Sequence, residues 1–184
     1  VVVMNTPGGN SVSAAEHSFS MLMALARNLP QATASLKAGK WEKSKFTGVE
    51  LAGKTLGVIG LGKVGREVAQ RGSAFRMKVL GVDPFVSAEA AGSYGTQLVP
   101  SSQLYAESDF ISLHLPLTGQ NHYFISNGEL DQCKEGVRIV NCARGGIVDE
   151  AALLRAIESG KVAGAALDVF ETEPPENVEL LAHE

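Results

Sequence analysis

Between residues 54 and 169 the chain alternates short, largely apolar runs with longer stretches of helical, amphipathic spacing. A strand that is apolar rather than alternating is typical of a parallel sheet covered by helices on both faces. Right-handed crossovers between such strands predict an α/β fold with a doubly wound parallel sheet. The predicted strands are Thr55–Ile59, Lys78–Val82, Phe110–Leu113, Val137–Asn141 and Ala163–Val169, and the predicted helices are Lys63–Ala74, Ser101–Glu107, Gly128–Cys133 and Glu150–Ser159.

The segment before this alternation has a different pattern. Ser13 and Glu16 fit a capping box, which predicts a helix from Ser13 to Asn28. This helix is apolar on nearly every face, so a second subunit or another domain of the same protein must cover it. Residues 31–50 are polar and predict an exposed arm with Trp41 and Phe46 as apolar anchors, or a solvated basic helix. We expect a homodimer or a higher homo-oligomer.

Composition and charge narrow the class of protein. The 184 residues are 45% hydrophobic and carry a net charge of −4, which excludes a disordered chain and argues against nucleic-acid or anionic-membrane surfaces. No apolar run approaches the roughly 20 residues that span a bilayer. Two cysteines are too few for a disulfide scaffold, which predicts a cytoplasmic location. We assign no metal site.

Both ends of the sequence read as cuts through a longer protein. We expect residues 1–10, with a turn from Asn5 to Asn10, to be a linker from a missing substrate domain. Residues 11–184 then form one nucleotide-binding domain.

The strongest motif is a glycine-rich turn between the first predicted strand and its helix. Gly60 would permit the tight turn, Gly62 would let a pyrophosphate approach the backbone, and Gly65 would let the helix pack closely. The helix start at Lys63 and Val64 offers free amides and a positive dipole to phosphates. This arrangement predicts a Rossmann-type dinucleotide site, although such glycines can also serve only a sharp turn.

An acidic residue closes the second predicted strand, 18 residues after Gly65. This residue, Asp83, is placed to accept hydrogen bonds from the adenosine ribose hydroxyls. Its charge would repel a 2′-phosphate, and no Arg or Lys follows it in the segment that begins with Pro84. NAD is therefore favoured over NADP as the cofactor.

Two later strand ends carry further candidate residues. Arg144 follows a strand at the edge where open α/β sheets bind ligands, and it is either a clamp for a carboxylate or a surface ion-pair partner. Asp168 closes the last predicted strand. Glu173 precedes a proline, and its spacing alone favours a surface acid over a site residue.

These motifs together resemble the NAD-binding domain of the D-isomer-specific 2-hydroxyacid dehydrogenases. The resemblance rests on Gly60–Gly65, Asp83, the segments 141–150 and 167–175, and it covers essentially the whole chain. The segments around Asn5, Ser13 and Trp41 are most similar to the branch of that family that oxidises 3-phosphoglycerate in serine biosynthesis.

The resemblance implies a role for each candidate. Arg144 would bind the carboxylate and keto oxygen of the substrate, and Glu173 would pair with the catalytic histidine and keep it protonatable. Asp168 would face the nicotinamide carboxamide. The remaining implied contacts are Leu115 and Pro116 beside the adenine and ribose, and Cys142 and Ala143 beside the nicotinamide.

One departure from the family pattern matters for activity. The family histidine lies in a Pro-His-x-Gly segment, and none of His17, His114, His122 and His183 stands in one. We therefore expect the 184 residues alone to bind NAD(H) and to turn over little or nothing. A smaller departure is Asn121, where close relatives carry a threonine near the cofactor.

Two other functions remain open on the same fold. A glyoxylate or hydroxypyruvate reductase would share the site but often uses NADPH, and Asp83 argues against that cofactor. An NAD(H)-sensing corepressor would use the dinucleotide as a switch and bind partner peptides in the missing domain.

Overall fold

The computed structural model describes residue 4 and residues 8–183. The predicted turn at Asn5–Pro7 lies outside the described residues. In chain order the elements are α1 (Ser11–Arg27), α2 (Leu29–Lys37), β1 (Thr55–Ile59), α3 (Lys63–Ala74), β2 (Lys78–Val82), α4 (Ala88–Gly92), β3 (Thr96–Leu98), α5 (Ser101–Glu107), β4 (Phe110–Leu113), α6 (Asn127–Gln132), β5 (Val137–Asn141), α7 (Glu150–Glu158), β6 (Val162–Leu167) and α8 (Val178–Ala182).

The strands form one six-stranded parallel sheet in the order β3-β2-β1-β4-β5-β6. The strand order reverses between β1 and β4, because β1 pairs with β2 on one side and with β4 on the other. This is the topological switch point of a doubly wound sheet. The predicted Rossmann-type fold is therefore confirmed.

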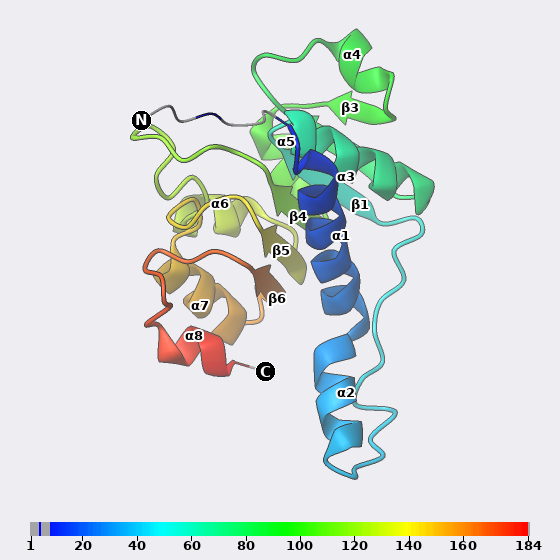
Figure 1. The fold of residues 1–184 in the computed structure, drawn as a ribbon, viewed down its shortest axis with the longest axis vertical. Coiled ribbons are helices and arrows are strands. Elements are labelled where there is room, and N and C mark those ends of the chain that lie inside the picture. The colour runs from blue at the N-terminus through cyan, green and yellow to red at the C-terminus, as the bar shows by residue number, and fades with distance from the viewer. Residues whose placement is uncertain (1–3, 5–7, 184) are drawn as a thin grey trace.

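Helices cover both faces of the sheet, as the largely apolar strands predicted (Figure 1). On one face, α1 and α3 pack on the sheet and bury Phe19, Leu22 and Val68. On the other face, α5, α6 and α7 pack through residues that include Leu104 and Leu153. The sheet is thus buried between two apolar layers, and its carboxyl edge is left for the connecting loops.

The predicted capping box at the first helix is wrong. Helix α1 begins at Ser11, its N-cap is Asn10, and the cap makes no side-chain hydrogen bond. The Ser13 hydroxyl instead donates to the carbonyl oxygen of Asn10, 2.9 Å away. Glu16 turns outward, where its carboxylate lies 3.5 Å from the guanidinium of Arg71. The turn at residues 8–10 starts the helix earlier than the side-chain pattern indicated.

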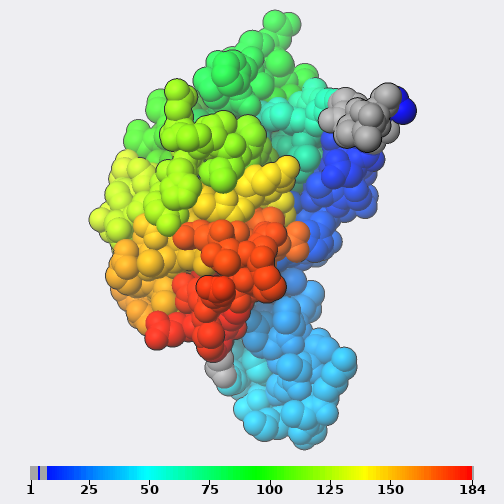
Figure 2. Space-filling model, turned by 60° about the vertical axis from the view of Figure 1, so that its left-hand side comes forward, coloured from blue at the N-terminus to red at the C-terminus, as the bar shows by residue number. Residues whose placement is uncertain are grey.

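The predicted exposed arm contains a helix of its own. Asn28 ends α1 in the left-handed conformation with φ 51°, and α2 begins immediately, with Pro30 in its first turn. The part that protrudes from the body of the molecule is residues 29–47 rather than the predicted 31–50, and it is called the arm from here on (Figure 2). Trp41 is 80% exposed and is no anchor within the chain, whereas Phe46 is half-buried.

Elsewhere the predicted boundaries differ only slightly from the observed ones. The last strand is β6, Val162–Leu167, rather than Ala163–Val169, and the short elements α4, β3 and α8 were not predicted. Both Cys133 and Cys142 are free thiols. Among the described residues, no helix combines the length and the apolar character needed to cross a membrane.

Candidate functional site

The carboxyl ends of the strands stand in register at one edge of the sheet. Strand pairing aligns Val82, Ile59, Leu113, Asn141 and Leu167 from strand to strand. The residues that directly follow them are Asp83, Gly60, His114, Cys142 and Asp168, and we call these five the strand-end row. All of them except His114 have a role in the site predicted from the sequence, and His114 directly precedes Leu115. The parallel sheet therefore brings most of the predicted site together along a single edge, on both sides of the switch point.

Each glycine of the turn after β1 has a distinct steric role. Gly60 has φ +88°, and a Cβ there would lie 2.6 Å from the carbonyl oxygen of His114. A Cβ at Gly65 would overlap the carbonyl oxygen of Gly60, so this glycine lets α3 close onto the turn. At Gly62 a Cβ would meet nothing within 4 Å. The space over Gly62 is thus open on the side where a ligand could approach.

Asp83 is fixed against the glycine turn by two backbone amides. Its Oδ2 accepts a hydrogen bond from the Leu61 amide at 2.7 Å, and its Oδ1 accepts one from the Phe85 amide at 2.8 Å. Each oxygen retains a further lone pair, because a carboxylate offers about four acceptor positions. Pro84 and Phe85 are exposed beside it. The carboxylate is therefore held at the turn and still able to accept from a ligand.

These residues fit a dinucleotide. Helix α3 begins at Lys63 with Gly62 as its N-cap, and no side chain caps it among the described residues. Its first amides, including that of Val64, and its positive dipole end can serve a pyrophosphate. The open space at Gly62 admits that group, and Asp83 lies at the adjacent strand end to accept from a ribose.

The loop after β5 is organised by a residue to which the sequence analysis assigned no role. Asn141 is buried; its Oδ1 accepts from the Ala143 amide at 3.0 Å, and its Nδ2 donates to the Arg144 carbonyl at 2.9 Å. The Arg144 side chain is exposed and donates to the Ala143 carbonyl oxygen at 2.6 Å. The sequence signal for this role is a polar residue, Asn141, at the end of a largely apolar predicted strand.

A second loop lies directly on the Arg144 loop and carries Glu173. A Cβ at Gly145 would overlap the carbonyl oxygen of Phe170, so the two loops touch through bare backbone. The Phe170 amide donates to Glu173 Oε1 at 3.3 Å, and the Glu173 side chain is exposed. The structure thus brings the loops of Arg144 and Glu173 into contact.

The Glu173 loop is also tied to the start of α7. Glu171 and Glu150 each accept a hydrogen bond from the backbone amide of the other, at 2.9 and 2.7 Å. The Tyr123 hydroxyl donates to the second Glu171 oxygen at 2.9 Å, and this bond raises the pKa of Tyr123. Sequence reasoning missed these three residues, because the contacts join positions distant along the chain.

The segment after β4 lies against the glycine turn. Burial lowers the pKa of His114 to about 4, and its Nε2 lies 2.9 Å from the Ser112 hydroxyl oxygen. A Cβ at Gly60 would lie 3.0 Å from the Leu115 side chain, so Leu115 borders the glycine turn. Asn121 donates to the Pro116 carbonyl oxygen at 2.6 Å and so braces its own loop.

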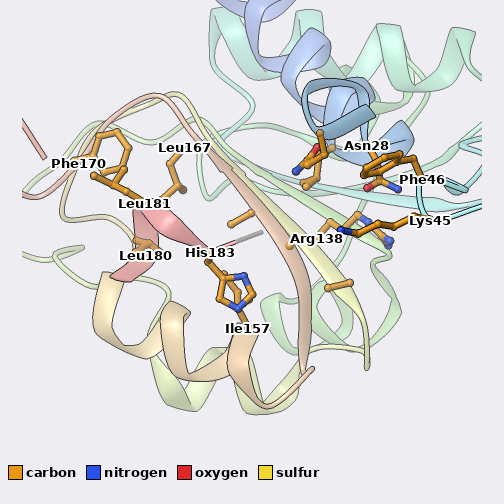
Figure 3. A pocket seen from close by; sticks show the side chains of 15 residues that line it. Asn28, Lys45, Phe46, Arg138, Ile157, Leu167, Phe170, Leu180, Leu181 and His183 are labelled. Atoms are coloured by element: carbon orange, nitrogen blue, oxygen red, sulfur yellow. The ribbon is translucent and has the colours of Figure 1, made fainter. Parts of the chain in front are cut away.

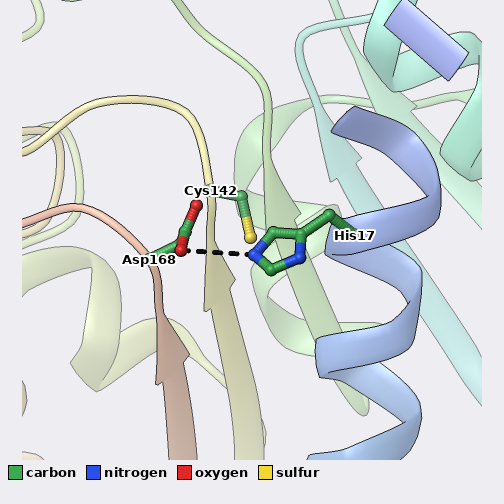
Figure 4. A group of neighbouring side chains, drawn as sticks. All are labelled: His17, Cys142 and Asp168. Carbon is green, nitrogen blue, oxygen red and sulfur yellow. Dashed lines mark ion pairs between the residues drawn. The ribbon is translucent and has the colours of Figure 1, made fainter. Parts of the chain in front are cut away.

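At the β6 end of the row, Asp168 meets a residue from the first helix. Asp168 Oδ1 lies 3.2 Å from Nε2 of His17 on α1, and the Cys142 thiol lies beside them (Figure 4). Burial raises the pKa of the Cys142 thiol, and the Asp168 carboxylate raises it further. Sequence reasoning assigned His17 no role, since nothing local links it to a strand end far along the chain.

A separate cavity of about 370 Å³ lies between the arm and the outer edge of β6 (Figure 3). Its lining includes Phe46, Arg138, Leu167 and His183, and it contains none of the predicted site residues. We therefore treat the strand-end row, rather than this cavity, as the candidate site.

The sequence matches a known protein family and several known enzymes. A family model described as D-isomer specific 2-hydroxyacid dehydrogenase, NAD binding domain, matches residues 19–184. D-3-phosphoglycerate dehydrogenase from Rattus norvegicus is 58% identical over 184 residues, and the enzyme from Bacillus subtilis is 48% identical over 183 residues. Each match covers 100% of this chain but only 34% and 35% of the relative, so the chain spans about a third of their length.

Solved structures agree in fold. A glyoxylate reductase from Paecilomyes thermophila has a TM-score of 0.87 at 36% identity, over 97% of this chain and 54% of its own. A D-lactate dehydrogenase from Aquifex aeolicus, complexed with NAD and lactic acid, has a TM-score of 0.85 at 36% identity, over 93% of this chain and 56% of its own. The cofactor is accordingly NAD. The chain belongs to the family of NAD-binding domains of the D-isomer specific 2-hydroxyacid dehydrogenases.

Proposed function

We propose that this chain is the NAD-binding domain of a D-3-phosphoglycerate dehydrogenase, a cytoplasmic enzyme of serine biosynthesis. The reaction is oxidation of 3-phosphoglycerate to 3-phosphohydroxypyruvate, with hydride transfer to NAD. The observation that carries this proposal is the identity of 48–58% with enzymes of that name across practically the whole chain. In this proposal residues 11–184 are the cofactor domain and residues 1–10 a linker to the substrate domain.

The cofactor side of the proposed site divides into two parts. The turn of Gly60, Gly62 and Gly65, with the Lys63 and Val64 amides, holds the pyrophosphate. Asp83, with Pro84 beside it, accepts from the adenosine ribose, and its fixed charge disfavours a 2′-phosphate. A second group of residues completes the contacts: Leu115 and Pro116 toward the adenosine, and Cys142, Ala143 and Asp168 toward the nicotinamide.

The substrate side rests on two charged residues that lie in touching loops. Arg144 binds the substrate carboxylate and keto oxygen through its planar guanidinium. Glu173 pairs with a histidine from outside these residues, and its negative charge holds that histidine protonatable near neutral pH. Bound NAD supplies the hydride acceptor, while the chain orients substrate and dinucleotide.

The test is an assay of the full-length enzyme that carries this domain. We expect NAD-dependent oxidation of 3-phosphoglycerate, and an Arg144→Ala variant that loses at least about 100-fold in kcat/KM but binds NADH normally. The 184 residues alone should bind NADH and turn over little, because they contain no Pro-His-x-Gly segment. Normal turnover by Arg144→Ala would contradict the assigned role.

A glyoxylate or hydroxypyruvate reductase is the second candidate, favoured by the structural match to a glyoxylate reductase. The same assay separates the two functions. Reduction of glyoxylate or hydroxypyruvate at a kcat/KM well above that for 3-phosphoglycerate would replace the first proposal with the second.

We also propose that the full protein is a homodimer or a higher homo-oligomer, with α1 and the arm as its contact. The arm stands clear of the body (Figure 2). It exposes Trp41 and Leu36, and α1 leaves Val12 exposed. Sedimentation at micromolar concentration tests this assembly. The chain should sediment as a dimer and Trp41→Ala should shift it toward monomer, whereas a wild-type monomer counts against the proposal.

A further inference from the structure

Three side chains of different chemistry converge at the β6 end of the strand-end row. His17 comes from α1, Cys142 directly follows β5, and Asp168 directly follows β6 (Figure 4). One ligand atom of each, an imidazole nitrogen, the thiol sulfur and a carboxylate oxygen, lies within 4.8 Å of the other two. Since these residues are far apart in sequence, only the fold brings them together.

The distances between these ligand atoms are close to those around a tetrahedrally coordinated cation. Ligand atoms about 2.0–2.3 Å from zinc lie about 3.3–3.8 Å from one another in a tetrahedron. The His17 Nε2 to Asp168 Oδ1 distance is already 3.2 Å. The Cys142 sulfur, within 4.8 Å of both, would have to move inward by no more than about 1.5 Å to complete that geometry.

The chemistry of the donors selects the class of ion. Nitrogen, thiolate and carboxylate together suit borderline ions such as Zn²⁺ and Co²⁺, whereas Mg²⁺ and Ca²⁺ require oxygen ligands. The side chains of His17 and Asp168 are each 51% exposed, so an ion can enter and a fourth position stays open to water. The Cys142 thiol donates to Met21 Sδ at 3.4 Å, a contact that ligation of an ion by the thiolate replaces.

We propose that His17, Cys142 and Asp168 form a three-residue binding site for Zn²⁺, with its fourth position open to solvent. Binding replaces the contact between His17 and Asp168 with two metal bonds, and the Cys142 thiol releases its proton to water as the thiolate ligates the ion.

The location gives the site a consequence that rests on the proposed function. Cys142 and Asp168 are two of the residues proposed to face the nicotinamide. A zinc ion held between them would occupy the end of the site where the nicotinamide binds. Zinc and NADH therefore exclude each other, and zinc acts as an inhibitor competitive with the dinucleotide.

Cobalt titration of the 184-residue chain tests the site without any need for activity. We expect a near-ultraviolet thiolate-to-cobalt charge-transfer band that saturates at one equivalent and that Zn²⁺ abolishes. Cys142→Ser should remove the band, and His17→Gln should weaken binding by at least about tenfold, since even changes outside the ligand set cost that much. His183→Gln, a histidine away from the cluster, is the matched control and should behave as wild type.

Circular dichroism confirms that each variant is folded before its titration is interpreted. Absence of the band in the wild-type chain would overturn the proposal, as would its persistence in Cys142→Ser, because the remaining thiol is then Cys133. Unchanged cobalt affinity in His17→Gln would also overturn the three-residue site.

NADH binding measured with and without Zn²⁺ separates this inference from the proposed function. Loss of NADH affinity on zinc addition in wild type, but not in Cys142→Ser, supports competition. Cobalt binding without any NADH binding would refute the proposed function and leave the metal site standing. NADH binding without cobalt binding would do the reverse.

Discussion

Replacing Gly62 by alanine separates cofactor binding from folding. The backbone at Gly62 has φ −64° and ψ −163°, which alanine adopts without strain, and the added methyl group meets nothing within 4 Å. Its cost is confined to the N-cap of α3, where alanine is poorer than glycine by about 1 kcal/mol or less. Reduced freedom of the unfolded chain offsets part of that cost. The variant should therefore unfold within about 1 kcal/mol of wild type.

The same methyl group stands where the pyrophosphate must approach the amides of α3. Displacing the phosphate from one charge-assisted hydrogen bond costs about 2 kcal/mol of binding free energy, which raises the dissociation constant for NADH about 30-fold. Gly65→Ala provides the contrast, because its methyl group would overlap the Gly60 carbonyl oxygen. Such overpacking should destabilise the fold by about 1–3 kcal/mol or more.

Urea unfolding and calorimetric titration with NADH measure both effects. The expected pattern is a stable Gly62→Ala variant with weak binding and an unstable Gly65→Ala variant. A Gly62→Ala variant that binds NADH as wild type does would show that the pyrophosphate does not lie against this turn, and the reasoning would fail.

Three further outcomes are expected. Asp83→Asn should lower the preference for NADH over NADPH by at least about tenfold in paired titrations, because the charge that repels a 2′-phosphate is gone; an unchanged ratio would refute the role of Asp83. His114 has a pKa of about 4 in the folded chain against an ordinary value of 6.5, so the unfolded chain binds its proton more readily and stability is lost as pH falls from about 6.5 to about 4. That loss should reach up to about 3 kcal/mol in urea unfolding and should be absent from His114→Asn, and equal slopes for the two proteins would contradict it. Tyr123→Phe removes the hydroxyl bond to Glu171, so the Glu171 and Glu150 amides should exchange hydrogen faster, and unchanged exchange would show that Tyr123 does not hold this loop.

Much of the fold follows from local patterns in the sequence. Largely apolar runs bounded by turns marked β1, β2, β4 and β5 at their observed limits. Strands of that kind, separated by helices, are typical of a parallel sheet covered on both faces, so the placement of Asp83 and Arg144 at one edge follows as well. The short elements β3 and α4, at the other end of the sheet, carry too few apolar positions to show a period.

The features that the sequence did not reveal depend on contacts between distant segments. The contact of His17 with Asp168 joins the first helix to the last strand, and the Glu171 bonds join the last loop to Tyr123 and α7. The capping box was misplaced for a different, local reason. The turn at residues 8–10 starts the helix at Ser11, so Ser13 lies inside the helix and not at its N-cap.

The central claim is that the turn at Gly60–Gly65 and the carboxylate of Asp83 hold the adenosine diphosphate half of NAD. Calorimetric titration of the chain with NADH, NADPH and ADP-ribose tests it most directly. The account predicts binding of NADH and of ADP-ribose, with NADPH weaker by at least about tenfold. Equal affinity for NADH and NADPH, or no binding of ADP-ribose, would contradict it.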